Sequence, residues 1–328
     1  MGDSEVNINR QYDVLCIGLI NMNMPVRPVD KGVFDRDVTM VDAIDIMPGG
    51  DAMNEAITLS RLGNRVGLVG KIGEDIFGQI LLEMTSRAGV DTKYICKDKN
   101  AGTSVCVMLV NQDGSRNFAS HRGANCEFSL EDIDLSILKQ TKIVNIGSIY
   151  ALKKLDGEGV ETILLEARKN GVITCADMMC DTYGKGFDAI KGALGKLDYF
   201  IPSYDEAAAV TGETRVEKIA EKLLDIGIKN VIIKLGAKGC FVSNDKQSFY
   251  EAPYEAEVVD TTGAGDNFVA GFLTGLNMNW ELSRCIELAN AVGSLAVGKV
   301  GSNGAVHSMD QVMEFMKNTR KININRSI

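Results

Sequence analysis

The sequence has few of the side chains that bind transition metals. His121 and His307 are its only two histidines, and none of its eight cysteines belongs to a Cys-x-x-Cys pair. A zinc site is therefore not expected. Most of the cysteines lie in apolar runs such as residues 14–17. This placement favours reduced, buried thiols that pack as small hydrophobic side chains over disulfides or metal ligands.

Long apolar runs and dense basic blocks are also missing. No stretch reaches the ~18 uninterrupted apolar residues that a membrane span needs. The net charge of −9 leaves no concentrated basic face for nucleic acid or an anionic membrane. Residues 1–5 are acidic where a secretory signal would be basic, and no apolar segment follows them. We expect a cytoplasmic protein with no nucleic-acid or membrane partner.

The composition that remains is that of an ordinary globular protein. With 328 residues, of which 45% are hydrophobic and 24% charged, the chain can bury a sizeable core. Short β-branched runs alternate with longer helical patterns. Continuous apolar strands separated by helices predict an α/β fold, in which a mostly parallel sheet is covered on both faces. Functional side chains are then expected at the carboxyl ends of the strands.

Several elements can be assigned from this alternation. The predicted strands are residues 13–18, 65–70, 142–147, 172–177, 198–201 and 230–236. The predicted helices between them are residues 52–62, 75–88, 157–170 and 216–226. Each of these helices is closed by a glycine where a left-handed cap is favoured, at Gly63, Gly89, Gly171 and Gly227.

Two stretches break the alternation. Residues 24–47 contain no good helix, and residues 104–110 and 116–121 predict a β-hairpin around the turn Asp113-Gly114. Such strands could form a small sheet that covers a ligand cleft, or merely extend the edge of the main sheet. The expected division is a core of residues 1–23, 49–102 and 123–328, with a β lid of residues 24–48 and 103–122.

The sharpest motif is Asp260-Thr-Thr-Gly-Ala-Gly-Asp266, a glycine-rich turn before a helix predicted at residues 267–276. The amides of Gly263, Ala264 and Gly265 make an anion-binding concavity at a helix start, where glycine lets a phosphate approach the backbone. The Asp266 carboxylate can then act as a general base on a hydroxyl, which is worth ~10²–10⁴-fold in rate. Its plain alternative is an N-cap, but the two glycines and two hydroxyls exceed what a cap requires.

This motif resembles the C-terminal signature of the ribokinase-like (PfkB) carbohydrate kinases. The segment Gly49-Gly-Asp-Ala-Met-Asn-Glu-Ala56 matches the family's second signature, and residues 62–78 are similar to its next conserved stretch. The resemblance spans nearly the whole chain and is closest to a bacterial branch of poorly assigned sugar kinases. It implies a three-layer α/β/α core with a small β lid. It also implies transfer of the γ-phosphate of ATP, with Mg²⁺, to a sugar hydroxyl.

The resemblance places a sugar site in the first half of the chain. It implies that Gly49, Gly50 and Asn54 contact the sugar, and Asp51 is a further candidate. Asn23 stands where the family usually carries a sugar-binding Asp. Because an amide donates at one end and accepts at the other, this difference leaves the hydroxyl pattern of the substrate open. Without the resemblance, Asn54 is equally well read as an ordinary polar residue of a first helical turn.

For Mg²⁺, the resemblance points to residues 202–206. This segment is similar to the family's Asn-x-x-Glu element, with Ser203 in place of the Asn and Glu206 in place of the Glu. In the family that Glu organises the water shell of Mg²⁺, a cation that prefers oxygen ligands. Taken alone, Glu206 is better explained as a favourable charge at the positive end of a helix.

For the nucleotide, the resemblance points to residues near two further elements. Lys234, Gly236 and Gly239 resemble the turn on the nucleotide side, where Lys234 could reach a phosphate at the end of its strand. Asn290 lies in a helix predicted at residues 282–297, whose small side chains look like the wall beside the adenine. Those small side chains could alternatively serve close helix packing only.

The resemblance also suggests a monovalent cation and a second subunit. Asp260, Thr262 and residues 298–304 resemble a monovalent-cation site of part of the family, so K⁺ is a further candidate. The plain alternative for Asp260 is an Asx turn that closes the strand. In relatives the lid often pairs two subunits, which predicts a homodimer.

Other classes of protein fit the motifs less well. A P-loop kinase lacks its GxxxxGK[ST] motif here, and a dinucleotide-binding oxidoreductase would need GxGxxG directly after the first strand. Two alternatives to a sugar kinase stay open. One is a nucleoside kinase of the same fold. The other is a catalytically weak, sugar-binding sensor, which Asn23 and Ser203 suggest and the intact residues 263–266 oppose.

Overall fold

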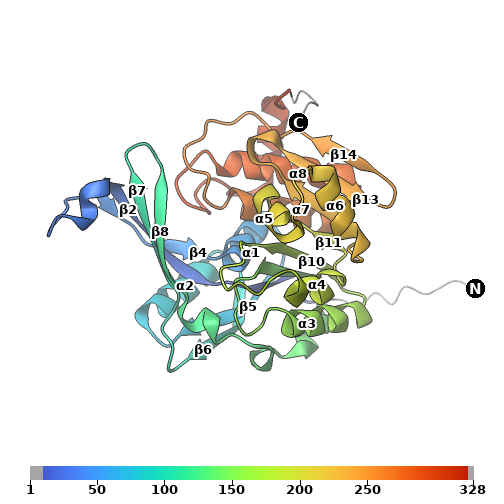
Figure 1. The fold of residues 1–328 in the computed structure, drawn as a ribbon, viewed down its shortest axis with the longest axis horizontal. Coiled ribbons are helices and arrows are strands. Elements are labelled where there is room, and N and C mark those ends of the chain that lie inside the picture. Colours follow the sequence, from blue (N-terminus) through green and yellow to red (C-terminus); the bar gives the residue numbers. More distant parts are fainter. Residues whose placement is uncertain (1–9, 324–328) are drawn as a thin grey trace, which may run out of the picture.

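The computed structural model describes residues 10–323 and is built around a nine-stranded sheet (Figure 1). Its strands are β1 (Tyr12–Gly18), β5 (Val66–Gly73), β6 (Asp91–Asp98), β9 (Thr141–Ile149), β10 (Ile173–Met178), β11 (Tyr199–Phe200), β12 (Asn230–Lys234), β13 (Cys240–Asn244) and β14 (Ser248–Glu251). They lie in the order β14-β13-β12-β11-β10-β9-β1-β5-β6. All pairs from β12 to β6 are parallel, and β13 and β14 add an antiparallel edge. The predicted α/β fold with a mostly parallel sheet is confirmed.

Helices cover both faces of this sheet. The α-helices are α1 (Asp51–Arg61), α2 (Ile76–Arg87), α3 (Glu158–Lys169), α4 (Asp188–Leu194), α5 (Tyr204–Thr211), α6 (Val216–Asp225), α7 (Ala264–Asn277), α8 (Leu282–Ala296) and α9 (Met309–Asn318). Successive residues of a strand point to opposite faces. Accordingly, Leu15 and Ile17 of β1 pack in the cluster that contains α3, α4 and α6. Val14 and Cys16 pack in the cluster that contains α1, α7 and α8.

The strands and helices predicted from the alternating pattern are all present, with small differences at their ends. The glycines predicted to close helices have the left-handed backbone that this position requires, for example φ of 89° at Gly63 and 87° at Gly89. The helix predicted at residues 267–276 begins earlier, at Ala264. The strands β6, β13 and β14 and the helix α4 were not predicted.

The two strand-rich inserts form a separate sheet, which we call the lid. Its strands are β2 (Asn21–Val29), β3 (Ala43–Ile44), β4 (Met47–Gly49), β7 (Val105–Asn111) and β8 (Arg116–His121). The predicted hairpin is the antiparallel pair of β7 and β8. Figure 1 shows the lid projecting from one side of the core. The inserts therefore do not extend the edge of the main sheet, although the exact residues that divide lid from core stay a prediction.

Two further features of the chain bear on its sequence-based interpretation. All eight cysteines are free thiols, and Cys16, Cys175, Cys240 and Cys285 are buried. Within residues 10–323, no helix has both the length and the apolar surface needed to cross a bilayer.

Candidate active site

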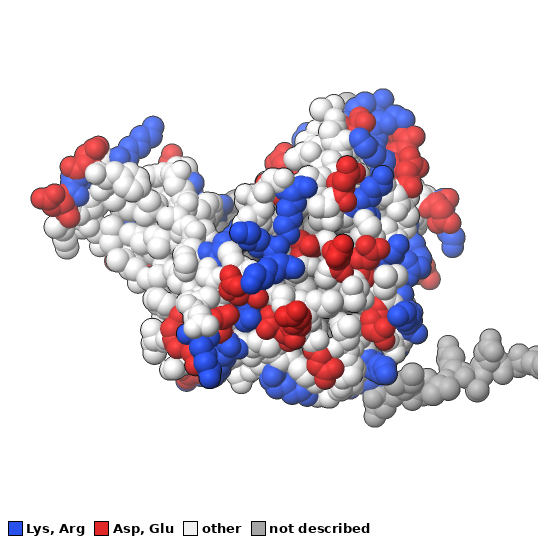
Figure 2. Space-filling model, turned by 60° about the horizontal axis from the view of Figure 1, so that its bottom comes forward, with Lys and Arg blue, Asp and Glu red and all other residues white. Residues whose placement is uncertain are grey.

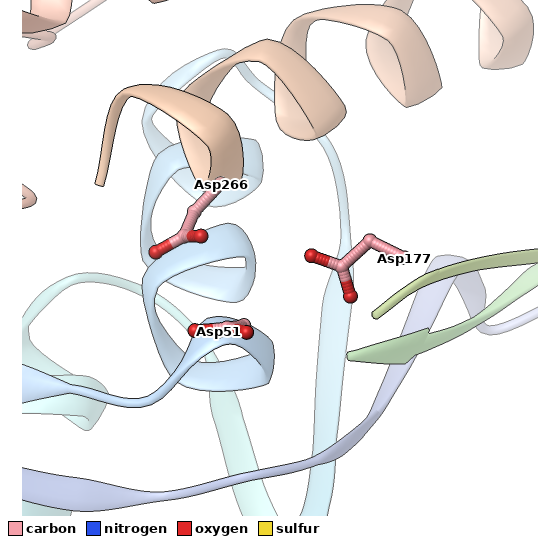
Figure 3. Close-up of side chains that lie close together, drawn as sticks. All are labelled: Asp51, Asp177 and Asp266. Atoms are coloured by element: carbon pink, nitrogen blue, oxygen red, sulfur yellow. The ribbon is translucent and has the colours of Figure 1, made fainter. Parts of the chain in front are cut away.

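Three carboxylates meet where strands of the main sheet end. Asp51 is the first residue of α1, Asp177 lies near the end of β10, and Asp266 lies in the first turn of α7. A carboxylate oxygen of each lies within 4.8 Å of one from both others, and Figure 3 shows the three side chains facing one space. Only Asp177 lies on a strand of the main sheet, and its position at the carboxyl end of β10 is where functional groups of a parallel sheet are expected. Asp51 and Asp266 reach this edge from the first turns of α1 and α7.

One ammonium group compensates part of this negative charge. Burial opposes the charge on Lys234, at the end of β12, but the nearby carboxylates outweigh this effect and raise its pKa. Burial also raises the pKa of Asp51 and Asp266, and it raises the pKa of Asp177 to about 7 although Lys234 acts against it. The cluster can therefore take up or release a proton near neutral pH.

Asp266 does not cap its helix. Gly263, with φ of 74°, is the N-cap of α7 and has no side chain to hydrogen bond, so the capping alternative for Asp266 does not hold. Instead, the Asp266 Oδ2 atom accepts a hydrogen bond of 2.7 Å from the Nδ2 atom of Asn54. The predicted sugar residue Asn54 thus fixes the orientation of the carboxylate.

The glycine-rich turn presents backbone amides at the start of α7. Among the described residues, the N–H groups of Gly263 and Gly265 have no hydrogen-bond acceptor, as expected for an anion site at a helix N-terminus. The Ala264 N–H differs, because it donates to the Thr261 carbonyl over a long distance of 3.3 Å. A Cβ atom on Gly263 would lie only 2.4 Å from the Ser302 Cβ atom. Glycine is therefore required at this position.

A buried amide that the sequence interpretation missed supports this turn. The Nδ2 atom of Asn267 donates to the carbonyl oxygens of Gly263 and Ser302, each at 2.7 Å. Its Oδ1 atom accepts from the Thr58 hydroxyl of α1 at 3.0 Å. Asn267 thereby ties the turn to α1 and to the loop around Ser302.

Most of the residues predicted for the nucleotide line one cavity. Its volume is about 350 Å³, and its wall includes Lys234, Gly236, Gly239, Asn290 and Gly265. The rest of the wall is mainly apolar, with side chains such as Pro253, Tyr254, Phe268 and Val297. An apolar cavity with a few polar groups at one end is typical of a small-molecule site.

Ser203 and Glu206 form a capping box at the start of α5. The Glu206 Oε2 atom accepts from the Ser203 N–H at 2.8 Å, and the Ser203 hydroxyl accepts from the Glu206 N–H at 3.4 Å. This agrees with the plainer interpretation of Glu206. The backbone of Ser203 nevertheless forms a parallel β-bridge with that of Lys234, which brings α5 beside the carboxylate cluster.

The remaining sugar candidates lie where the lid joins the core. Asn23 of β2 is buried, and its Oδ1 atom accepts from the Asn21 Nδ2 atom at 2.7 Å. A Cβ atom on Gly49 would lie 2.4 Å from the Asn23 amide nitrogen, so glycine lets this amide fit. Gly50, with φ of 88°, is the N-cap of α1 and leads directly to Asp51.

Asp177 and Ser148 were also missed. The Ser148 N–H donates to Asp177 Oδ1 at 2.7 Å, and its hydroxyl contacts the Asp51 carboxylate. Ser148 follows the strand predicted at residues 142–147, and Asp177 ends the one predicted at residues 172–177. The rule that functional groups follow parallel strands could have identified both.

Below the cluster lies a buried acid–amide pair. Glu55 and Asn145 are both fully buried, and the Asn145 Nδ2 atom donates to Glu55 Oε2 at 2.7 Å. The two remaining oxygens, Glu55 Oε1 and Asn145 Oδ1, have no partner. Burial and the neighbouring carboxylates raise the pKa of Glu55 well above its usual value. A protonated Glu55 can donate to Asn145 Oδ1 and satisfy both oxygens.

We therefore expect Glu55→Gln, which imitates the neutral acid, to fold at least as stably as the parent protein at pH 6. A raised pKa stabilises the fold below the unfolded-state value and loses this contribution as pH rises through the folded-state value. Between these two pKa values, the parent should lose roughly 1.4 kcal/mol of unfolding free energy per pH unit from this group. Glu55→Gln should lose correspondingly less.

Urea denaturation between pH 6 and pH 9 measures this difference. Glu83→Gln, at an exposed position of α2, is the control and should keep the pH dependence of the parent. A large loss of stability in Glu55→Gln at pH 6, or an unchanged pH dependence, would mean that Glu55 is ionised in the fold.

Comparisons with known proteins show which proteins this chain is similar to. A family model described as pfkB family carbohydrate kinase matches residues 11–309. The ATP-dependent 6-phosphofructokinase of Thermoanaerobacterium thermosaccharolyticum is 30% identical over 305 residues, which cover 92% of each chain. The ribokinase of Thermotoga maritima is 25% identical, with a TM-score of 0.80 over 94% of this chain and 100% of that one.

A further solved structure shares the fold. An E. coli protein in complex with ATP and Mg²⁺ is 23% identical and superposes with a TM-score of 0.80. The alignment covers 93% of this chain and 99% of that one.

Proposed function

This chain belongs to the pfkB family of carbohydrate kinases, and we propose that Asp266 is the general base with which it phosphorylates a sugar hydroxyl. Membership of the family makes the chain an ATP-dependent sugar kinase. The observation that carries the proposal is the position of Asp266. Its carboxylate lies in the first turn of α7, beside the unpaired amides of Gly263 and Gly265 and the cavity lined by Lys234.

The proposed reaction is an in-line transfer. Asp266, oriented by Asn54, takes the proton of the acceptor hydroxyl, and the resulting oxygen forms a bond to the γ-phosphorus of ATP. The bond between this phosphorus and the β–γ bridging oxygen breaks, and ADP leaves with that electron pair. The amides of Gly263 and Gly265 stabilise charge on the phosphoryl oxygens as the transfer proceeds.

The raised pKa of Asp266 suits this role. A general base works best when its pKa lies near the working pH, because it must be ionised before the transfer and hold the proton afterwards. Burial raises the pKa of Asp266, whereas Asn54 and Lys234 act in the opposite direction and keep the carboxylate usable as a base.

The donor atoms available here fit a bound Mg²⁺. When bound, Mg²⁺ would neutralise charge on the phosphates of ATP. Hard cations prefer carboxylate and water oxygens. Glu206, whose Oε2 atom serves the capping box, would hold the ion through water, and Lys234 would offset further phosphate charge next to Gly265.

On the sugar side, we propose that Asn23, Gly49, Gly50, Asp51 and Asn54 contact the acceptor. The half-buried carboxylate of Asp51 can accept hydrogen bonds from neighbouring sugar hydroxyls. One relative is named a 6-phosphofructokinase and another a ribokinase, and these names refer to different acceptors. The acceptor of this chain therefore has to be found by experiment.

We expect Asp266→Asn to lower kcat by about 10²-fold or more, since the amide cannot accept the proton. The apparent affinity for the sugar should change little, because the Asn54 hydrogen bond can persist. A coupled ADP-release assay over sugars, sugar acids, phosphosugars and nucleosides first identifies the acceptor and then measures the variant.

Asp310→Asn is the matched control, because Asp310 is an exposed aspartate in the first turn of another helix, α9. It should turn over like the parent protein. Undiminished turnover in Asp266→Asn would refute the proposed base. Binding of a sugar by the parent protein without any release of ADP would favour the sensor.

We also propose that the lid pairs with the lid of a second copy. Its described residues expose several large apolar side chains, with 84% of Phe34, 87% of Met40 and 59% of Phe118 accessible to solvent. In Figure 2 the projecting lid is largely free of charge between its tip and its root. Apolar surface of this extent is typical of a protein interface.

Met40→Lys combined with Phe118→Lys should therefore convert a dimer into a monomer. Burying two ammonium groups between apolar surfaces costs more free energy than the association of the two lids contributes. Sedimentation velocity at micromolar concentration measures the mass. Leu165→Lys, at an exposed apolar position of α3, is the control and should remain dimeric. A monomeric parent protein would contradict the proposal.

A further inference from the structure

One side chain of the lid reaches the glycine-rich turn. Arg116 is the first residue of β8, and its Nη1 atom lies 2.5 Å from the Asp260 Oδ1 atom. Its Nη2 atom donates to the Thr261 hydroxyl at 2.8 Å, and its Nη1 atom also contacts the Thr262 hydroxyl. Only 22% of the Arg116 side chain and 13% of the Asp260 side chain are exposed. The guanidinium thus contacts three consecutive residues that lead into Gly263.

Asp260 in turn connects the turn before Gly263 with the loop at Gly301. Its Oδ1 atom accepts from the Thr262 N–H at 2.9 Å and the Thr262 hydroxyl at 2.7 Å. Its Oδ2 atom accepts from the Gly301 N–H at 2.8 Å. These bonds and Arg116 lower the pKa of Asp260 although burial acts against them, so the carboxylate is charged at neutral pH.

The ion pair lies beside a gap between the lid and the core. A cavity of about 380 Å³ separates Pro25 and Met108 of the lid from Val259 and Gly301 of the core, and Arg116 lines it. Side chains across a cavity cannot pack, so they contribute little attraction. At this edge the lid side chain Met47 lies close to Gly301, and the polar contacts of Arg116 add to the attachment.

We propose that Arg116 is a positioning residue for phosphoryl transfer, which fastens the closed lid to the turn that carries the anion-binding amides. The inference rests on the proposed function and adds a regulation of the same site. When the lid is closed, Arg116 holds residues 260–262 and thereby the Gly263 amide. When the lid opens, the turn loses this support. Phosphate stabilisation is thus coupled to closure over the acceptor, which limits transfer to water.

The Arg116 guanidinium also contacts the side-chain oxygens that were predicted to bind K⁺. Asp260 and Thr262 are the side chains of that expected monovalent-cation site, and Arg116 contacts both. A fixed guanidinium supplies the positive charge that a bound cation would bring. Turnover is therefore expected to be the same in Na⁺ and K⁺ salts.

The test compares Arg116→Ala with the parent protein. Misplacing a catalytic group by about 1 Å costs on the order of 10²-fold, and we expect kcat to fall by up to this factor while KM for the acceptor changes little. Added guanidinium chloride at low millimolar concentration should restore part of the kcat. A loss of stability alone would lower both parameters through the folded fraction and would not respond to guanidinium.

Two further variants make the test specific. Arg36→Ala removes a more exposed ion pair of the lid, with Asp30 at 2.5 Å, and should turn over like the parent protein. In Asp260→Asn, the additional change Arg116→Ala should have little further effect on kcat, because Arg116 acts through Asp260. Equal losses in the Arg36 and Arg116 variants, fully additive losses, or strong stimulation of the parent protein by K⁺ would overturn the proposal.

Hydrogen exchange separates this proposal from the proposed function. Without any ligand, Arg116→Ala should speed the exchange of amides in residues 259–265, and Arg36→Ala should leave it unchanged. A parent protein that phosphorylates no acceptor would refute the kinase mechanism, yet the exchange result would still support or refute the attachment. Unchanged exchange together with unchanged kcat would refute the role of Arg116.

Discussion

The repulsion among Asp51, Asp177 and Asp266 is the constraint on which the site depends. Three carboxylates within 4.8 Å of one another cannot all be charged without compensation. Lys234 supplies one positive charge, and the N-termini of α1 and α7, where Asp51 and Asp266 lie, supply the positive ends of two helix dipoles. A further negative charge below them would be costly. The neutral pairing available to Glu55 and Asn145 avoids it.

This balance explains why the same residues can bind and react. A carboxylate whose pKa is raised by burial, as that of Asp266 is, accepts a proton more readily than an ordinary aspartate, whose pKa is ~3.9. Lys234 then serves two needs, because it offsets the cluster before a phosphate arrives and faces the turn at Gly265 that is proposed to receive it. More negative charge on the carboxylate cluster would repel ATP, and less would leave no ionised carboxylate to act as the base.

The sequence predicted what is local and missed what is distant. The strands, the helices and the turn before Asp266 follow from residues that are neighbours in the chain. Asp177 and Ser148 meet across 29 residues, and Arg116 meets Asp260 across 144. A local pattern can mark Asp177 and Ser148 one by one, as residues at predicted strand ends, but it does not predict that either pair is in contact. The strand β6 was missed for another reason: it lies at the edge of the sheet and carries charged residues such as Lys93 and Lys97 instead of a continuous apolar run.

The distant contacts converge on the short segment from Asp260 to Asn267. Asn54 and Thr58 of α1 hold Asp266 and Asn267, and Arg116 of the lid holds Asp260. Alone, this segment would be a flexible turn, since glycine loses more backbone entropy on ordering than any other residue. Because α1 supplies two of the sugar candidates, Asp51 and Asn54, as well as the support for α7, the acceptor and phosphate sides form one packed unit. The lid is the part of the site that belongs to a separate sheet, and Arg116 connects it to this segment.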